Sequence, residues 1–144
     1  EMLRSLVGSE MCIRDSYKGD GCKCDALIKL AESNTIIGVC PEQMGGLPTP
    51  RDPAERQGDK VISCAGKDVT KAYTKGAETA LYFAKLNHVD FAVMKAKSPS
   101  CGKGLIYDGT FTGNKIPGNG VTVELLNAHG IPVFTEDELD QLSL

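Results

Sequence analysis

Two cysteines lie close in sequence to residues that can accept or donate protons. Each is in a short polar segment that follows an apolar segment. The segment Val39–Gln43 reads VCPEQ, with Glu42 two residues after Cys40. The segment Lys97–Gly102 reads KSPSCG, with two serines ahead of Cys101. In a parallel α/β sheet, ligands bind at the loops that leave the carboxyl ends of the strands, so segments far apart in the sequence can meet there. The chemistry of this chain is therefore expected where the two cysteines meet.

A thiol next to a carboxyl group and hydroxyls supports several chemistries. In a buried pocket the Glu42 carboxylate suits general acid–base work, whereas in solvent it is a surface charge and Cys40 a small buried hydrophobe. Pro99 stiffens the second segment, and Gly102 lets the backbone approach a ligand. Together the two cysteines allow a disulfide, a metal site or an iron–sulfur cluster. Cys101 alone allows nucleophilic thiol chemistry.

The remaining cysteines and histidines carry weaker signals. Zinc is disfavoured, because neither segment holds a CxxC pair and no histidine lies near either one. Cys22 and Cys24 form a CxC in a glycine-rich stretch, which is a weak indication of metal ligands. Cys64 follows a strand-like stretch and is predicted to be structural. His88 and His129 fall at the ends of helices and are predicted to be surface residues.

Composition bounds the function class. The 144 residues suit one domain with a sizeable core. A net charge of −3 gives no electrostatic footprint for nucleic acid or an anionic membrane. No apolar run approaches the ~20 residues that span a bilayer, and no secretory signal is recognisable. Six cysteines within an α/β pattern predict reduced or metal-bound thiols and a cytoplasmic location.

The elements that must position the two cysteine segments alternate between strand and helix, which predicts a single-domain, Rossmann-like, three-layer α/β fold with a mostly parallel sheet. β-branched runs predict strands, and apolar residues at three-and-four spacing predict helices. The expected strands are Asn34–Val39, Lys60–Ser63, Asp90–Lys95 and Ile131–Phe134. The expected helices are 25–32, Asp68–Asn87 with Asp68 as N-cap, Gly120–His129 with Gly130 as C-cap, and a turn at Glu136–Leu142. Between them, Cys40–Gly58 is expected to be a long loop without regular structure, and 104–119 a hairpin or an ordered loop.

Five segments taken together resemble one family. They are VCPEQ at 39–43, GGLPTPR at 45–51, GKDVT at 66–70, KSPSCG at 97–102 and IYDGTF at 106–111. The resemblance runs from Tyr17 to Glu136 and is to the family called domain of unknown function 523, which contains the iron–sulfur-dependent 2-thiouracil desulfidases.

This resemblance implies an enzyme that removes sulfur from a thiolated heterocycle without redox chemistry. In the family three cysteines hold a 4Fe–4S cluster with one iron open, and the sulfur bound there leaves as hydrosulfide. Cys40 and Cys101 match two of the cluster ligands, Glu42 matches the acidic catalytic residue, and Ser98 or Ser100 the catalytic serine. The implied partner is a small thiolated substrate, not nucleic acid or membrane, and a homodimer is left open. A cofactor-free α/β domain that binds a small ligand, metal or sulfur is the alternative from another class.

The N-terminus departs from the family. Members begin with a strand leading into Ser-x-Cys-Leu-Leu-Gly, whose cysteine is the first cluster ligand and falls at Ser9 here. Residues 5–16 instead resemble a translated sequencing adapter, so 1–16 are expected to be foreign to a desulfidase-like domain at 17–144.

Two consequences follow for the site. The first strand is expected to be replaced or missing, with Leu3–Val7 partly refilling its place. Cys12 is a poor substitute for the absent ligand at Ser9, because a displacement of three residues along a strand turns the side chain to the opposite face. Two cysteines hold a cluster poorly, so this particular chain is expected to be inactive.

Overall fold

The computed structural model of the chain describes residues 3–8, 32, 34–48, 51–94, 98–135 and 138. Its strands are β1 (Leu3–Gly8), β2 (Asn34–Val39), β3 (Ala54–Gln57), β4 (Lys60–Ser63), β5 (Phe91–Met94), β6 (Leu105–Tyr107), β7 (Lys115–Pro117) and β8 (Val133–Thr135). Its helices are α3 (Pro41–Met44), α4 (Thr70–Leu86) and α5 (Val121–Ala128).

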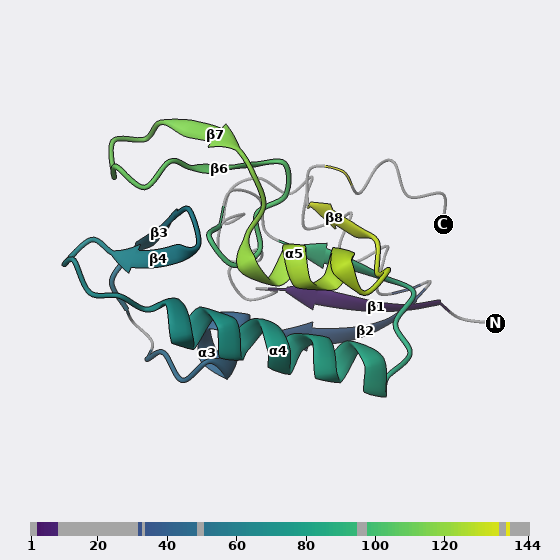
Figure 1. Cartoon of the computed structure of the whole chain (residues 1–144). Helices are drawn as coiled ribbons and strands as arrows, with labels where there is room; N and C mark the ends of the chain where they lie inside the picture. Colours follow the sequence, from purple (N-terminus) through teal and green to yellow (C-terminus); the bar gives the residue numbers. More distant parts are fainter. Residues whose placement is uncertain are drawn as a thin grey trace.

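A four-stranded parallel sheet forms the centre, in the order β2-β1-β5-β8. β1 lies between β2 and β5, so that Gly8 pairs with Val39 and Ser5 with Phe91. The strand that the sequence left open is thus filled by Leu3–Gly8 (Figure 1). The predicted α/β class with a mostly parallel sheet is confirmed.

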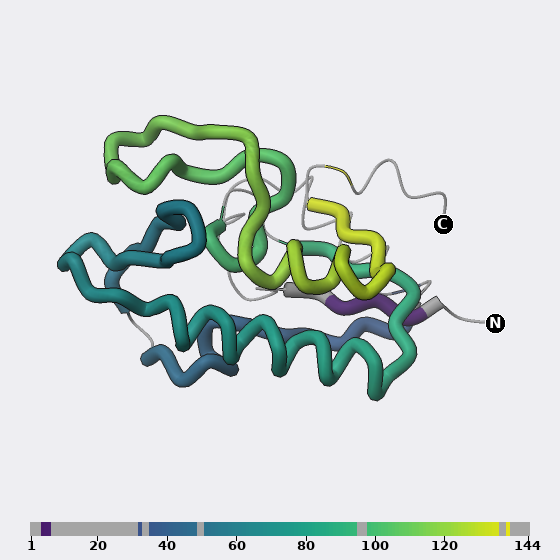
Figure 2. Tube along the Cα trace, viewed as in Figure 1, coloured from purple at the N-terminus to yellow at the C-terminus, as the bar shows by residue number. Residues whose placement is uncertain are grey.

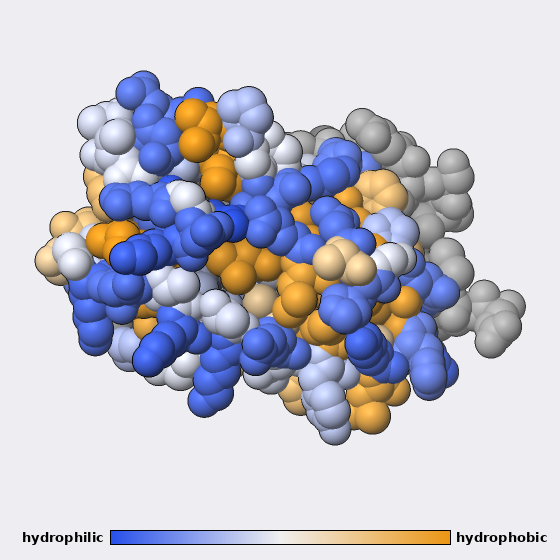
Figure 3. Space-filling model, in the orientation of Figure 1, coloured by the Kyte–Doolittle hydropathy of each residue, from blue (hydrophilic) through white to orange (hydrophobic). Residues whose placement is uncertain are grey.

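The helices α4 and α5 pack on each other and lie in front of the sheet in Figure 1. Between them and the strands sits the core, which includes Leu6, Met94 and Leu126, all fully buried. Hydrophilic residues cover much of this face, with hydrophobic ones gathered near its middle (Figure 3). The helix expected at 25–32 lies outside the described residues except for Glu32, so the third layer stays a prediction.

Two antiparallel hairpins, β3–β4 and β6–β7, stand beyond the carboxyl ends of β1 and β2 (Figures 1 and 2). The side chain of Glu55 joins them. Its Oε1 accepts the N–H groups of Gly109 at 3.0 Å and of Phe111 at 3.1 Å, and Gln57 donates to the Gly109 carbonyl oxygen at 2.9 Å. Because Glu55 is buried, these amides replace the water that an ionised carboxylate requires.

We expect Glu55→Ala to lower the free energy of unfolding by about 2–3 kcal/mol, since two amides bonded to a charged acceptor lose their partner. Glu55→Gln keeps an oxygen at the same place and should lose less than half of that. Urea unfolding of both variants measures the difference. Equal losses in the two variants would mean that the side chain acts by packing alone.

Several boundaries differ from the sequence predictions. The supposed loop Cys40–Gly58 contains α3 and β3, because Pro41 suits the first turn of a helix and β3 gains its pairing from β4. The long helix begins at Thr70, with Val69 as N-cap. Asp68 precedes the N-cap by one residue, and from there its carboxylate accepts the N–H of Thr70.

Nearer the C-terminus, the observed element boundaries differ less from the predicted ones. His129 is the C-cap of α5, and Gly130 follows it with φ of 77°, a conformation that glycine adopts without strain. The last strand is Val133–Thr135 instead of Ile131–Phe134. The strands at 34–39 and 60–63 and the hairpin within 104–119 are confirmed.

A buried polar side chain lies on the central strand β1, on the face opposite to the one where Leu6 joins the core. Ser5 is fully buried, and its hydroxyl has no hydrogen-bond partner among the described residues. We expect Ser5→Ala to raise the free energy of unfolding by about 1 kcal/mol, because an unpaired buried hydroxyl is removed. Ser63→Ala is the matched control, and it should lower the free energy of unfolding. The buried Ser63 hydroxyl accepts the N–H of Lys67, so this substitution removes a hydrogen bond. A loss of stability in Ser5→Ala, measured by urea unfolding, would contradict this account.

Candidate active site at the carboxyl edge of the sheet

The ends of three neighbouring strands bring the sequence-predicted residues to one edge. Cys40 directly follows β2, and the segment with Cys101 follows β5. Between them ends β1, whose last residue, Gly8, is opposite Val39. The position where the family places its first cluster ligand, Ser9, is the next residue in the chain and lies outside the described residues.

Local chemistry sets the conformation of Cys40. Its φ of −128° and ψ of 97° are extended, as expected of a residue before proline, and its carbonyl oxygen accepts the N–H of Met44 at 2.9 Å. Pro41 then opens α3, which carries Glu42 in its first turn. Glu42 and Cys40 are both half-buried at this edge.

Two glycines allow α3 to lie directly against the backbone of α4. A β-carbon on Gly76 would lie 1.8 Å from the carbonyl oxygen of Pro41, and one on Gly45 would lie 1.9 Å from that of Ala72. Both distances are far inside van der Waals contact. This close approach brings Tyr73, on the same turn of α4, to Glu42.

Glu42 is held by a cation and a phenol. The Nε of Arg51 donates to Glu42 Oε2 at 2.6 Å, and Arg51 Nη2 lies 3.9 Å from the Sγ of Cys40. Burial opposes the charge of Arg51, but its attraction to Glu42 outweighs this, and the pKa of Arg51 is raised. Burial also raises the pKa of Tyr73, and its hydrogen bond with Glu42 raises it further. The Tyr73 hydroxyl therefore keeps its proton and donates it to the carboxylate.

The segment that carries Cys101 is a tight turn organised by Ser98. The hydroxyl oxygen of Ser98 accepts the N–H groups of Ser100 and Cys101, each at 3.1 Å, and its carbonyl oxygen accepts that of Gly102 at 2.8 Å. Cys101 is 1% exposed. Ser98 is half-buried, and its hydroxyl oxygen lies within this turn against the backbone N–H of Cys101.

The same turn is fastened to the start of α5. The hydroxyls of Ser100 and Thr122 lie 2.9 Å apart and are both fully buried, and the carbonyl oxygen of Ser100 accepts the N–H of Thr122. A β-carbon on Gly120 would lie 2.3 Å from the carbonyl group of Ser100. Ser100 therefore faces the interior and fixes the turn on which Cys101 stands.

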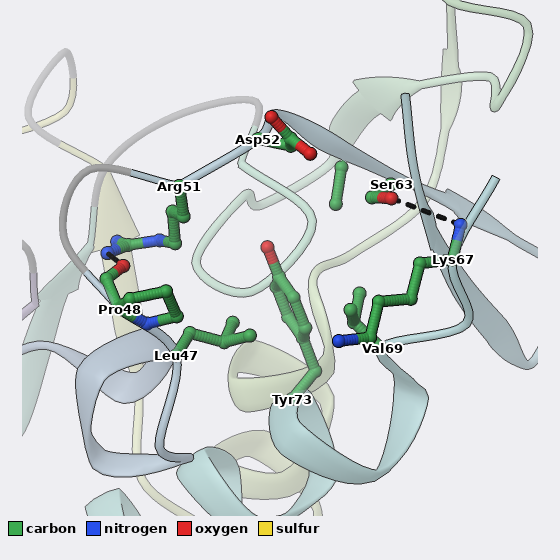
Figure 4. A pocket seen from close by; sticks show the side chains of 9 residues that line it. Leu47, Pro48, Arg51, Asp52, Ser63, Lys67, Val69 and Tyr73 are labelled. Carbon is green, nitrogen blue, oxygen red and sulfur yellow. Dashed lines mark hydrogen bonds between the residues drawn. The ribbon is translucent and has the colours of Figure 1, made fainter. Parts of the chain in front are cut away.

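A cavity of about 260 Å³ adjoins Glu42's two partners. Apolar side chains line much of it, namely Leu47, Pro48, Ala54 and Val69. Arg51 and Tyr73 line it as well. Figure 4 shows the Tyr73 ring rising into its middle, with Arg51 to one side and Ser63 and Lys67 to the other. The groups that hold Glu42 are thus also walls of a small, mostly apolar cavity.

Sequence reasoning found some of these residues and missed others. Cys40 and Glu42 were placed at one site, as the structure has them. In the sequence, Arg51 is only the last residue of GGLPTPR, and nothing marks Tyr73 as a site residue. The sequence around Arg51 or Tyr73 does not indicate that either residue contacts Glu42, because that contact depends on how α3 packs against α4.

The other cysteines and histidines do not join this site. Cys64, predicted to be structural, is exposed in the turn after β4. His88 and His129 are exposed, as predicted. Cys12, Cys22 and Cys24 lie outside the described residues. Within the described ranges no three His, Cys, Asp or Glu side chains are grouped to hold a metal ion, and no helix there has the length and apolarity to cross a membrane.

Comparison with known proteins identifies the family. The family model for 2-thiouracil desulfurase matches residues 11–138. An uncharacterised Bacillus subtilis protein, YbbK, is 37% identical over 151 residues, which cover 98% of each chain. The solved structure of a 4Fe–4S-dependent thiouracil desulfidase, TudS, is 42% identical, covers 98% of this chain and 95% of that one, and superposes with a TM-score of 0.87. The resemblance carried by the five segments is confirmed, and the chain belongs to the 2-thiouracil desulfurase family.

Proposed function

We propose that the protein is a desulfidase that converts a thiolated heterocycle such as 2-thiouracil to its oxygen analogue. The net reaction replaces C=S by C=O, consumes one water and releases hydrosulfide, so no electrons are exchanged. The observation that carries this proposal is the placement of a half-buried carboxylate, Glu42, at the sheet edge where Cys40 and Cys101 both stand. The family match and the likeness to a thiouracil desulfidase support it.

The proposed cofactor is a 4Fe–4S cluster, and the described residues fit part of its ligand set. Thiolates are the ligands that such clusters require, and Cys40 and Cys101 supply two from neighbouring loops. Arg51 places a positive charge near the first of them, with Nη2 3.9 Å from its sulfur. The third position is Ser9, a hydroxyl residue. When bound, the cluster supplies a Lewis-acidic iron for the substrate sulfur.

The side chains of this chain have separate proposed roles. Glu42 takes a proton from the attacking water, because it is the carboxylate at this edge that also contacts a cavity wall. Ser98, next to Cys101, passes a proton toward the departing sulfur. Ser100, bonded to Thr122, takes part by holding the turn in place. Nucleophilic chemistry at Cys101 is disfavoured by its 1% exposure.

The cavity indicates the size of the substrate. Pockets for drug-sized ligands measure roughly 300–1,000 Å³, and about 260 Å³ suits a single heterocyclic ring with small substituents. Apolar side chains can cover the faces of such a ring, and the polar side chains of Arg51, Asp52, Ser63 and Lys67, which also line the cavity, can bond its polar edge. We propose a free small molecule as substrate, without nucleic acid or membrane as partner. A cytoplasmic location follows from thiolate ligands, which need a reducing compartment. The homodimer and the boundary between 1–16 and 17–144 stay predictions.

Reconstitution with iron and sulfide in the absence of air tests the cofactor. We expect the Ser9→Cys chain to bind iron and to show the broad visible absorption of an iron–sulfur cluster, and the unchanged chain to bind little. In the Ser9→Cys chain, Cys40→Ala and Cys101→Ala should each abolish both signals. Cys64→Ala, at an exposed turn, is the control that should change neither.

Turnover tests the reaction itself. The loaded Ser9→Cys chain should release one hydrosulfide for each uracil formed from 2-thiouracil, with no added reductant. Iron binding by the unchanged chain as well would mean that Cys12, Cys22 or Cys24 supplies the third ligand. Failure of both chains to bind iron would overturn the cluster, and a need for reductant would overturn the non-redox reaction.

A further inference from the structure

Arg51 joins three parts of the candidate active site. Its Nε donates to Glu42 Oε2 at 2.6 Å, its Nη2 lies 3.9 Å from Cys40 Sγ, and its Nη1 donates to the Pro48 carbonyl oxygen at 3.2 Å. The guanidinium is a rigid planar fork, so these contacts fix the position of the Glu42 carboxylate relative to the cysteine sulfur. The side chains of Arg51 and Glu42 are each 19% exposed, which leaves the pair little contact with water.

Tyr73 restrains the same carboxylate from α4. Its phenol lies beside the Glu42 carboxylate, whose charge adds to burial in raising the pKa of Tyr73, and the residue is 3% exposed. Arg51 and Tyr73 also line the cavity (Figure 4). The carboxylate is therefore held between two residues that belong both to its own ion-pair network and to the cavity wall.

We propose that Arg51 is a positioning residue, which fixes Glu42 between the sulfur of Cys40 and the cavity so that the carboxylate can reach the water that attacks the substrate. This proposal rests on the proposed desulfidase function. Arg51 acts through Glu42 and does not itself transfer a proton. A displacement of about 1 Å in a catalytic group can cost 10²-fold in rate, so loss of this support should appear in kcat.

A second arginine of the chain provides a matched control. Arg56 also pairs with a carboxylate, Glu124 at 2.9 Å, and donates to a backbone carbonyl oxygen, that of Asn119 at 2.6 Å. It makes the same kinds of contact as Arg51, but its partners among the described residues are Gly58, Asn119 and Glu124 instead of Glu42 and Cys40. A variant at Arg56 thus measures what losing a structural ion pair costs.

The experiment compares Arg51→Ala with Arg56→Ala in the full chain. Both substitutions are made in the form that binds iron, either the unchanged chain or the Ser9→Cys chain. We expect Arg51→Ala to retain its iron and KM within a few-fold, while kcat falls about 100-fold. Because Arg51 lines a cavity, millimolar guanidinium ion can enter the space left by its side chain and should restore part of kcat. Urea, which has the same shape without the charge, should not. Arg56→Ala should keep kcat and show no response to guanidinium.

Three results would overturn the proposal. Unchanged kcat in Arg51→Ala would show that Glu42 needs no positioning, loss of iron would show that Arg51 serves Cys40 instead, and an equal response in Arg56→Ala would show a general effect on the fold. A crystal structure of cofactor-free Arg51→Ala gives a readout that does not depend on turnover. The Glu42 carboxylate should leave its place beside Tyr73, and a carboxylate that stays there would overturn the proposal even if the desulfidase function itself fails.

Discussion

Replacing Gly76 by alanine is expected to lower the free energy of unfolding by about 3 kcal/mol or more. Overpacking a core costs roughly 1–3 kcal/mol when side chains can move aside. Here the new β-carbon would lie 1.8 Å from a backbone carbonyl oxygen, that of Pro41, so α3 and α4 must separate. Urea unfolding of the cofactor-free chain measures the loss, and because α3 carries Glu42 and follows Cys40, iron binding should fall with it.

The control for this prediction is a glycine whose neighbour can yield. A β-carbon on Gly118 would lie 3.1 Å from the terminal Cδ1 of Ile106, a flexible side-chain end. We expect Gly118→Ala to change the free energy of unfolding by less than about 1 kcal/mol. If Gly76→Ala is equally mild, the backbone contact between the two helices is not as close as described.

Changing Glu42 to glutamine is expected to lower kcat by about 10²- to 10⁴-fold, the range that a positioned general base contributes. Glutamine keeps the size of the side chain and can still accept the hydrogen bond from Arg51, but it cannot take a proton from water. Iron content and the visible absorption should be unchanged, because the carboxylate is not a proposed cluster ligand. Steady-state turnover of 2-thiouracil in the iron-loaded chain provides the measurement.

The matched control is Glu124→Gln, which removes the carboxylate of the comparable ion pair with Arg56. It should leave kcat within a few-fold of the parent chain. Turnover that persists in Glu42→Gln would remove Glu42 from the role of base and leave Ser98 as the candidate. Loss of iron in Glu42→Gln would mean that the carboxylate supports the cluster.

The sequence predicted the parts of the site that follow directly from strands. Asn34–Val39 and Phe91–Met94 are runs of β-branched and apolar residues, and their places in one parallel sheet put Cys40 and the Ser98–Cys101 turn at the same edge. The composition of such runs is enough to predict that they form strands. That is why the two cysteine segments could be brought together before any coordinates were known.

What escaped prediction depends on tertiary contacts. β3 has the sequence Ala-Glu-Arg-Gln, and its buried residue is the charged Glu55, which gives no apolar alternation to detect. α3 is four residues long, too short for a periodic pattern. The partnership of Arg51 and Tyr73 with Glu42 arises only when the two glycine contacts bring α3 and α4 together, and a sequence pattern does not encode that approach.

The central place of β1 has a consequence for the order of events during synthesis. β1 leaves the ribosome well before one of the strands that it pairs with, β5, which begins at residue 91. Pairing Ser5 with Phe91 closes a long loop of chain, and such distant contacts slow folding. Until β5 emerges, one edge of the nascent β1 has no partner and is open to pairing with other chains. Assembly of the cysteine edge is therefore a late event, and we expect chaperones to bind the nascent chain chiefly between β1 and β5.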